Sequence, residues 1–181
     1  RAGNRVPGIG PAGGGGALGI GAEIGHAGSP DARVWGADPA WPVHIPLMNS
    51  VGLQLATYRY YHKDSHSVDF NGMVEDLRGA RPGDVVLLHG CCHNPTGANL
   101  NATQWDEVIK VLLETGATPM IDIAYQGFGD GLEEDAAGAR AVVAAVPEAI
   151  VAASCSKNFG IYRERTGILM AVSKDTSAKG L

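Results

Sequence analysis

The sequence has 181 residues, of which 45% are hydrophobic and 18% charged, and these proportions are typical of one globular domain with a buried core. Its formal net charge of -5 offers no basic surface for nucleic acid, and no apolar run is long enough to cross a bilayer. Three cysteines, two of them adjacent, and a start without an apolar leader predict a cytoplasmic protein without a disulfide framework.

Glycine dominates the first thirty residues, including the stretch "GIGPAGGGGALGIGAEIGHAGSP" (8–30). Glycine disfavours a helix by about 1 kcal/mol per residue relative to alanine, so this stretch predicts a loop that leads into a weak helix at about Ala17–Ile24. A flexible low-complexity tail is the alternative. We assign no role to residues 1–12 and treat residues 13–181 as one domain.

Strand and helix patterns then alternate along the chain. Apolar runs such as "DVVLLHG" (84–90) predict strands covered on both faces, and amphipathic stretches such as "QWDEVIKVLLETG" (104–116) predict helices. The alternation predicts a three-layer α/β fold, with helices on both faces of a mainly parallel sheet. Strands are expected at 32–37, 53–61, 84–90, 118–125, 149–154 and 166–172, and helices near 44–51, 71–79, 101–116 and 133–146.

Polar residues begin the last expected helix and follow the last expected strand. The acidic run 133–135 is interpreted as the solvated first turn of the helix, where acids suit the helix dipole. The polar end of the sequence directly follows the last expected strand. We interpret this as a domain that is cut short.

Polar side chains gather just after three of the expected strands. In open α/β sheets, ligands bind beyond the carboxyl ends of the strands. Taken singly, each residue has a structural explanation; Lys157, for example, could be a solvated loop lysine. Together they predict a crevice that holds an amine, a carboxylate, a phenol, an amide and the guanidinium of Arg165. The residues are His89, His93 and Asn94 after the first strand, Asp122 and Tyr125 after the second, and Ser154 and Lys157 after the third.

The segment "HGCCH" (89–93) could suggest a metal site. Four ligands within five consecutive residues do not easily surround one tetrahedral ion, and zinc sites usually space their ligands in separated pairs. We therefore predict no metal site, and we interpret the cysteines Cys91, Cys92 and Cys155 as small packing residues.

Three motifs resemble those of a known enzyme family. "HNPTG" (93–97), "DIAYQGFGDG" (122–131) and "SCSKNFGIYRERTG" (154–167), in this order and at these intervals, resemble the class I aminotransferases of fold type I, which depend on pyridoxal 5'-phosphate (PLP). Within that family the likeness is to the aspartate and aromatic amino-acid branch. "DPAWPVH" (38–44) and "DFNGMVEDL" (69–77) resemble the same branch, and the similarity runs from about Gly13 to Val172.

The resemblance implies an activity and a quaternary structure. Members transfer an amino group between an L-amino acid and a 2-oxo acid by a ping-pong mechanism, and they form homodimers. It also implies that residues 13–181 form the PLP-binding core of the large domain, and that the small domain and the arginines that bind the substrate lie beyond Leu181. The alternatives are a PLP-dependent lyase or decarboxylase, and a non-catalytic remnant or binding module.

The resemblance also assigns roles at the reacting end of the cofactor. Lys157 would bind the aldehyde of PLP and, once freed by the amino acid, move the proton. Asp122 would pair with the pyridine nitrogen and keep the ring protonated. Asn94 and Tyr125 would hydrogen-bond the phenolic oxygen of the ring.

Other matching residues would hold the phosphate and the ring face. Arg165 would clamp the phosphate in a bidentate manner, with Ser154 as a further hydroxyl donor. The family carries a Ser-Gly-Thr-Gly-Ala-Leu-like loop here, whereas this sequence has four glycines, so the amides of Gly14 and Gly15 remain but two hydroxyls are lost. Each lost hydrogen bond to a charged group would cost about 1.5–3 kcal/mol of affinity. The remaining matches are Trp41, which would stack on the ring, and His44 and His89, which would lie near the aspartate.

Overall fold

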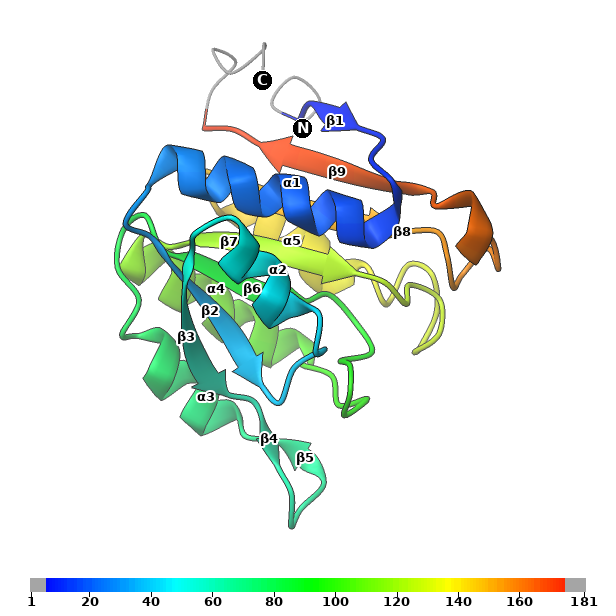
Figure 1. The fold of residues 1–181 in the computed structure, drawn as a ribbon. Helices are drawn as coiled ribbons and strands as arrows, with labels where there is room; N and C mark the ends of the chain where they lie inside the picture. Colours follow the sequence, from blue (N-terminus) through cyan, green and yellow to red (C-terminus); the bar gives the residue numbers. More distant parts are fainter. Residues whose placement is uncertain (1–5, 175–181) are drawn as a thin grey trace.

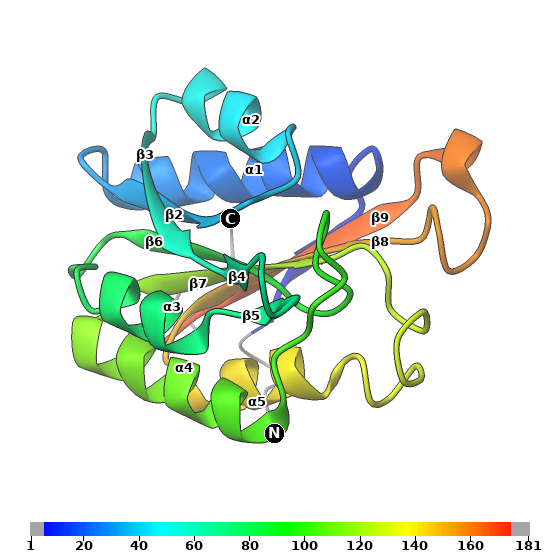
Figure 2. The same cartoon turned by 90° about the horizontal axis from the view of Figure 1, so that it is seen from below.

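The computed structural model describes residues 6–174, and it contains a seven-stranded sheet with strand order β1-β9-β8-β7-β6-β2-β3. Helices α1 and α2 cover one face of the sheet, and α3, α4 and α5 cover the other (Figures 1 and 2). The strands are β1 (Gly8–Ile9), β2 (Arg33–Asp38), β3 (Gln54–Arg59), β6 (Val85–His89), β7 (Thr118–Ile123), β8 (Ala149–Ser154) and β9 (Gly167–Val172). The helices are α1 (Gly13–Gly28), α2 (His44–Ser50), α3 (Phe70–Leu77), α4 (Ala102–Thr115) and α5 (Ala137–Ala145), with a 3-10 turn η1 (Tyr162–Glu164).

The predicted three-layer α/β fold is confirmed. Strands β3, β2, β6, β7 and β8 run parallel, while β9 is antiparallel to β8 and β1 is antiparallel to β9. Part of the segment without an assigned role therefore joins the sheet as β1. Residues 1–5 of that segment, and residues 175–181 of the polar end, lie outside the described residues. No helix within 6–174 is long and apolar enough to span a membrane.

The predicted strand at 53–61 is shorter than expected. β3 ends at Arg59, and the chain then forms a separate two-stranded hairpin of β4 (Tyr61–His62) and β5 (Ser67–Val68). The helix predicted at 101–116 forms as α4, where Asn101 and Gln104 make a reciprocal capping box. Local signals of this kind are visible in the sequence, whereas the point at which a strand leaves the sheet depends on its neighbours.

The glycine-rich region forms a longer helix than its propensity predicts. α1 has 16 residues and begins at Gly13, whereas the sequence predicted a weak helix near Ala17–Ile24. Ala17, Leu18 and Ala22 are almost fully buried against the sheet, and this apolar burial offsets the cost of the glycines. An added Cβ at Gly21 would lie 3.0 Å from the Ile150 side chain, so a small residue is what allows the close approach.

The prediction for the acidic run 133–135 is wrong for the helix start and for Asp135, while Glu133 and Glu134 are exposed as expected. α5 begins at Ala137, and Asp135 is only 7% exposed rather than solvated. Its carboxylate accepts hydrogen bonds from the backbone amides of Gly127, Gly129 and Asp130 at 2.8–2.9 Å. Asp135 therefore fixes the loop that follows β7, because it satisfies amides that no strand or helix uses.

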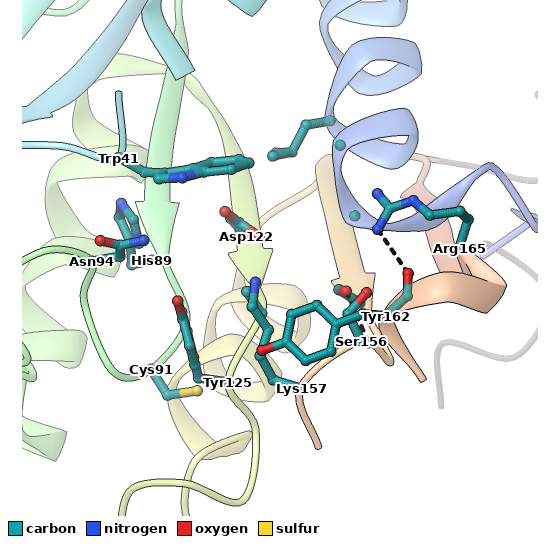
Figure 3. A pocket seen from close by; sticks show the side chains of 15 residues that line it. Trp41, His89, Cys91, Asn94, Asp122, Tyr125, Ser156, Lys157, Tyr162 and Arg165 are labelled. Atoms are coloured by element: carbon teal, nitrogen blue, oxygen red, sulfur yellow. Dashed lines mark hydrogen bonds between the residues drawn. The ribbon is translucent and has the colours of Figure 1, made fainter. Parts of the chain in front are cut away.

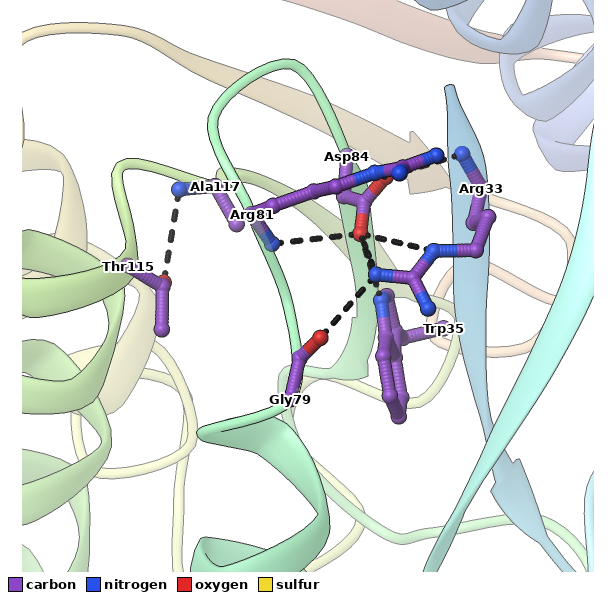
Figure 4. A network of polar contacts seen from close by, with 7 residues as sticks. All are labelled: Arg33, Trp35, Gly79, Arg81, Asp84, Thr115 and Ala117. Atoms are coloured by element: carbon purple, nitrogen blue, oxygen red, sulfur yellow. Dashed lines mark hydrogen bonds and ion pairs between the residues drawn. The ribbon is translucent and has the colours of Figure 1, made fainter. Parts of the chain in front are cut away.

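Another buried carboxylate, Asp84, lies at the opposite edge of the sheet from the β7–α5 loop. It accepts hydrogen bonds from the Arg33 backbone and side chain, from Trp35 Nε1 and from the Arg81 amide (Figure 4). Burial raises the pKa of Asp84, but these donors outweigh burial and hold the pKa below its usual value. Asp84 thus ties together the starts of β2 and β6, and its partners give it a structural role.

Candidate active site

The candidate site lies where three neighbouring parallel strands end. His89 at the end of β6 pairs in register with Asp122 on β7, and Asp122 pairs with Ala152 on β8. Ser154 is the last residue of β8. Because these strands end at one edge of the sheet, residues far apart in the sequence become neighbours there.

One cavity at this edge brings the predicted cofactor-binding residues together (Figure 3). His89 also lines it, whereas His44 lies behind Asp122 and contacts it directly. The predicted residues that line the cavity are Gly14, Gly15, Trp41, His89, Asn94, Asp122, Tyr125, Ser154, Lys157 and Arg165. The expected convergence of an amine, a carboxylate and a guanidinium is therefore present.

Asp122 is held by the first residue of α2. Its side-chain oxygen Oδ2 lies 3.0 Å from His44 Nε2, and both residues are buried. The ring of His44 meets Trp41 edge-on, with the centroids 5.2 Å apart. One short segment thus supplies both a partner that orients the carboxylate and an indole that lies over the cavity (Figure 3).

Burial keeps two imidazoles near Asp122 uncharged. It lowers the pKa of His89 to about 3, an effect that His93 increases and Asp122 opposes. Burial also lowers the pKa of His93 to about 4, with a further contribution from His44. Both rings are therefore neutral at pH 7. His89 Nε2 is buried and has no hydrogen-bond partner among the described residues, so it is available to a group in the cavity.

The amine of Lys157 lies between aromatic rings. Its Nζ is 4.7 Å from the centroid of the Tyr125 ring and 5.9 Å from that of Tyr162. A cation over aromatic faces is stabilised by the ring quadrupole. In Figure 3, Trp41 lies across the cavity from Lys157 and Tyr125, so a flat ligand between them would have an indole on one side and the amine on the other.

At the remaining end, the guanidinium of Arg165 packs against the start of α1. Arg165 has a positive φ of 49°, and its Nη1 donates to the Tyr162 carbonyl at 3.2 Å. A Cβ added to Gly13 would lie 2.8 Å from Arg165 Nη2, and one added to Gly14 would lie 2.9 Å from Ser154 Cβ. Helix amides, a hydroxyl and a guanidinium thus converge, and together they form an anion-binding arrangement.

Sequence reasoning missed several residues of the cavity. Ser156 is buried and donates its amide to Ser154 Oγ, while Tyr162 lies in η1 and is exposed. Both lie between β8 and β9, outside the strands and α-helices, where no hydrophobic period marks a side chain as pointing inward. Their closeness to Lys157 in the sequence was the available signal. The others are Leu18, Cys91 and Ala124.

Comparison with known proteins decides the family. Residues 6–178 match the family model for aminotransferases of class I and II. The chain belongs to this family. The match spans all the strands and helices described above, and it confirms the resemblance that the motifs indicated.

The relatives of this aminotransferase chain lie in the aspartate and aromatic branch. An aromatic-amino-acid aminotransferase of Paracoccus denitrificans is 57% identical over 169 residues, which are 93% of this chain and 43% of the relative. An aspartate aminotransferase of Escherichia coli (strain K12) is 46% identical over 164 residues, 91% of this chain and 41% of the relative. The chain thus spans less than half the length of the relatives it matches.

A solved structure shows the same fold for this aminotransferase core. The aromatic-amino-acid aminotransferase from Burkholderia pseudomallei, solved covalently bound to pyridoxal phosphate, superposes with a TM-score of 0.94 at 43% identity. The superposition covers 97% of this chain and 45% of that structure. The seven-stranded mixed sheet is therefore the architecture of aminotransferases from the same branch.

Proposed function

We propose that this chain binds PLP in the cavity at the ends of β6, β7 and β8, and that it contributes this site to amino-group transfer between an L-amino acid, aspartate or aromatic, and a 2-oxo acid. The observation that carries the proposal is the convergence of Lys157, Asp122 and Arg165 in one cavity. These are the three charged groups that the resemblance assigns to the aldehyde, the ring nitrogen and the phosphate.

The guanidinium end of the cavity fits a phosphate. Arg165 and the first amides of α1 supply positive charge and donors, and the Ser154 hydroxyl lies against Gly14. The absence of a side chain at Gly14 lets the helix start come this close to Ser154. These residues would bind the phosphate and fix the position of the rest of the cofactor.

The opposite end fits a pyridine ring. Asp122 offers a carboxylate that His44 orients, and Trp41 offers a flat apolar face. Asn94 and Tyr125 also line the cavity and supply an amide and a phenol. A ring held here would find an anion for its protonated nitrogen and donors for its oxygen.

Lys157 is the residue that we assign to proton movement. PLP, when bound, supplies an aldehyde and an electron-accepting ring. The amine of Lys157 would hold that aldehyde and, after release, carry a proton. It lines the cavity and lies over the rings of Tyr125 and Tyr162.

A titration with PLP tests the proposal. We expect a saturable visible band. Conversion of that band by aspartate or tyrosine, with release of the matching 2-oxo acid, would show that the chain also performs the amino-group transfer. Release of carbon dioxide instead would indicate a decarboxylase. A chain that gives no saturable band would contradict the proposal. The homodimer and the cytoplasmic location stay predictions; sedimentation of the loaded chain would test the dimer.

A PLP-binding module without turnover is the second candidate. The observation that favours it is the run Gly13–Gly16, where the family loop carries two hydroxyls that this chain lacks. A band that forms but does not respond to any amino acid would support this candidate. Cofactor binding and turnover are therefore measured separately.

The two positions that lack a hydroxyl, Gly13 and Gly15, differ in the space available to a side chain. Nothing lies within 4 Å of a Cβ built at Gly15, so Gly15→Thr is expected to fit and to add a donor at the anion-binding end. The gain is about 1.5–3 kcal/mol, or about 10–100-fold in PLP affinity. Equilibrium titration of the visible band measures it.

Gly13→Ser provides the matched control for this gain. Gly13 has a φ of +72°, and its added Cβ would lie 2.8 Å from Arg165 Nη2. A left-handed conformation costs a non-glycine residue about 1–2 kcal/mol, so Gly13→Ser is expected to weaken binding or leave it unchanged. Tighter binding by Gly13→Ser together with no gain from Gly15→Thr would contradict the placement of the phosphate.

A further inference from the structure

A second cluster of potential ligands lies beside the candidate active site. The thiols of Cys91 and Cys92 and a carboxylate oxygen of Asp135 all lie within 4.8 Å of one another. Cys91 and Asp135 are buried, and Cys92 is partly buried. The segment from His89 to His93 gives no sign of this carboxylate, because Asp135 comes from the separate β7–α5 loop.

The backbone at Cys92 explains how two adjacent thiols can share one ion. Side chains of consecutive residues in extended chain point to opposite sides. Cys92 has a φ of +46° and so departs from extended chain. With this turn the Cys92 thiol lies close to the Cys91 thiol, and the third ligand comes from a separate loop, so the ligands are not confined to one short segment.

Backbone amides hold the Asp135 carboxylate in place at the cluster in its charged form. Burial raises its pKa, but backbone amides led by that of Gly129 outweigh burial and hold the pKa below its usual value. Within the described residues, Oδ2 accepts two hydrogen bonds and Oδ1 accepts one. One carboxylate oxygen lies within 4.8 Å of both thiols, so an ion between these atoms would meet a negative charge.

The cavity next to the cluster carries negative charge. A cavity of about 560 Å³ is lined by Cys91 and Asp135 and also by the acids Asp106, Asp130 and Glu134. No lysine or arginine lines this cavity in the part of the chain that the structure describes. Clefts lined by one sign of charge concentrate ions of the opposite sign, so this cavity is a route by which a cation reaches the Cys91 thiol and Asp135.

We propose that Cys91, Cys92 and Asp135 bind one thiophilic divalent cation, of the class of Zn²⁺ or Cd²⁺. Thiolate ligands select soft ions, and three protein ligands leave a fourth tetrahedral position for water. Binding replaces two S–H protons by two metal–sulfur bonds, so two protons leave for each ion bound and the metal is neither oxidised nor reduced. The site does not depend on the proposed cofactor.

The site touches the loop that carries Tyr125. Cys92 Sγ lies 4.0 Å from the Tyr125 carbonyl oxygen, and Cys91 also lines the candidate active site. Asp135 holds the same loop through its amides. An ion bound by Cys91, Cys92 and Asp135 would therefore contact the loop that carries Tyr125, and its binding would shift the position of Tyr125.

Titration of the PLP-free chain with Cd²⁺ tests the proposal. We expect the ultraviolet charge-transfer band of cadmium–thiolate bonds, saturation at one ion per chain, and release of two protons per ion in weakly buffered solution. Cys92→Ser and Cys91→Ser are expected to lose most of the band. Cys155→Ser is the matched control, because Cys155 is the third cysteine of the chain and lies outside the cluster. This variant is expected to keep the band.

A second measurement uses the unaltered chain and so does not depend on how a variant folds. Zn²⁺ is expected to protect Cys92 from alkylation while the partly exposed Cys155 reacts at an unchanged rate, as followed by peptide mass mapping. No charge-transfer band, a band that survives both Cys91→Ser and Cys92→Ser, or equal protection of Cys155 would each overturn the proposal.

Discussion

Lys157→Ala is expected to abolish covalent attachment of PLP to this chain. Borohydride reduction of the PLP-loaded chain should leave a stable adduct on the peptide that contains Lys157, and the variant should leave none there. The physical reason is that Nζ of Lys157 lies in the same cavity as Asp122 and Arg165. Mass mapping of the reduced, digested chain measures the adduct directly, whether or not the chain turns over an amino acid.

Two further variants separate the nucleophile from the charge. Lys157→Arg keeps a cation between Tyr125 and Tyr162, but a guanidinium stays protonated and cannot attack an aldehyde, so the adduct should again be absent. Lys110→Ala removes an exposed lysine on α4 that pairs with Glu107, and it should leave the adduct unchanged. An adduct that persists at equal yield in Lys157→Ala would show that surface lysines carry it, and the assignment of Lys157 would fall.

The alternation of elements could be predicted because its signals are local. The buried strand β6 reads as a continuous apolar run, and α4 reads as an amphipathic period that starts at a capping residue. The mainly parallel sheet with helices on both faces also follows from this alternation, whereas the order of its strands was not predicted. The reversal of β9 against β8 does not follow, since an irregular connection of this length permits either direction.

The parts that the sequence did not predict depend on contacts between distant residues. α1 forms in spite of its glycines because the sheet buries Ala17 and Leu18, and propensity contains no information about that surface. Asp135 looks like a helix-start acid in the sequence, yet the loop from Gly127 to Asp130 folds around it. Neither result is visible in a window of neighbouring residues.

The residues of the candidate site also fall into those that the sequence could place and those that it could not. The residues at strand ends could be placed together from the sequence, because parallel strands bring their carboxyl ends to one edge. Tyr162 and Ser156 lie between β8 and β9, outside the strands and α-helices, where the path of the chain is set by tertiary packing. The cluster of Cys91, Cys92 and Asp135 could not be predicted for two reasons. It depends on a local turn at Cys92, and it depends on Asp135 reaching the thiols from a loop distant in sequence.

Asp122→Asn is expected to weaken PLP binding and to slow any amino-group transfer. Asparagine has nearly the same shape and can still accept from His44 Nε2, so the α2 entry should keep its position. What is lost is the negative charge opposite a protonated pyridine nitrogen. Loss of one charged hydrogen bond costs about 1.5–3 kcal/mol, or about 10–100-fold in affinity, and loss of one preorganised electrostatic partner lowers a rate by about 10²–10³-fold.

The control for Asp122→Asn is Glu148→Gln, which removes an exposed acid just before the start of β8, at the other end of that strand from the cavity. Both variants change the net charge by one unit, so a long-range effect of charge would alter both alike, and only a local role separates them. PLP affinity is read from the visible band and the rate from 2-oxo-acid release. Equal affinity in Asp122→Asn and the unaltered chain would show that the cofactor ring does not meet this carboxylate, and the ring and phosphate ends of the cavity would have to be assigned anew.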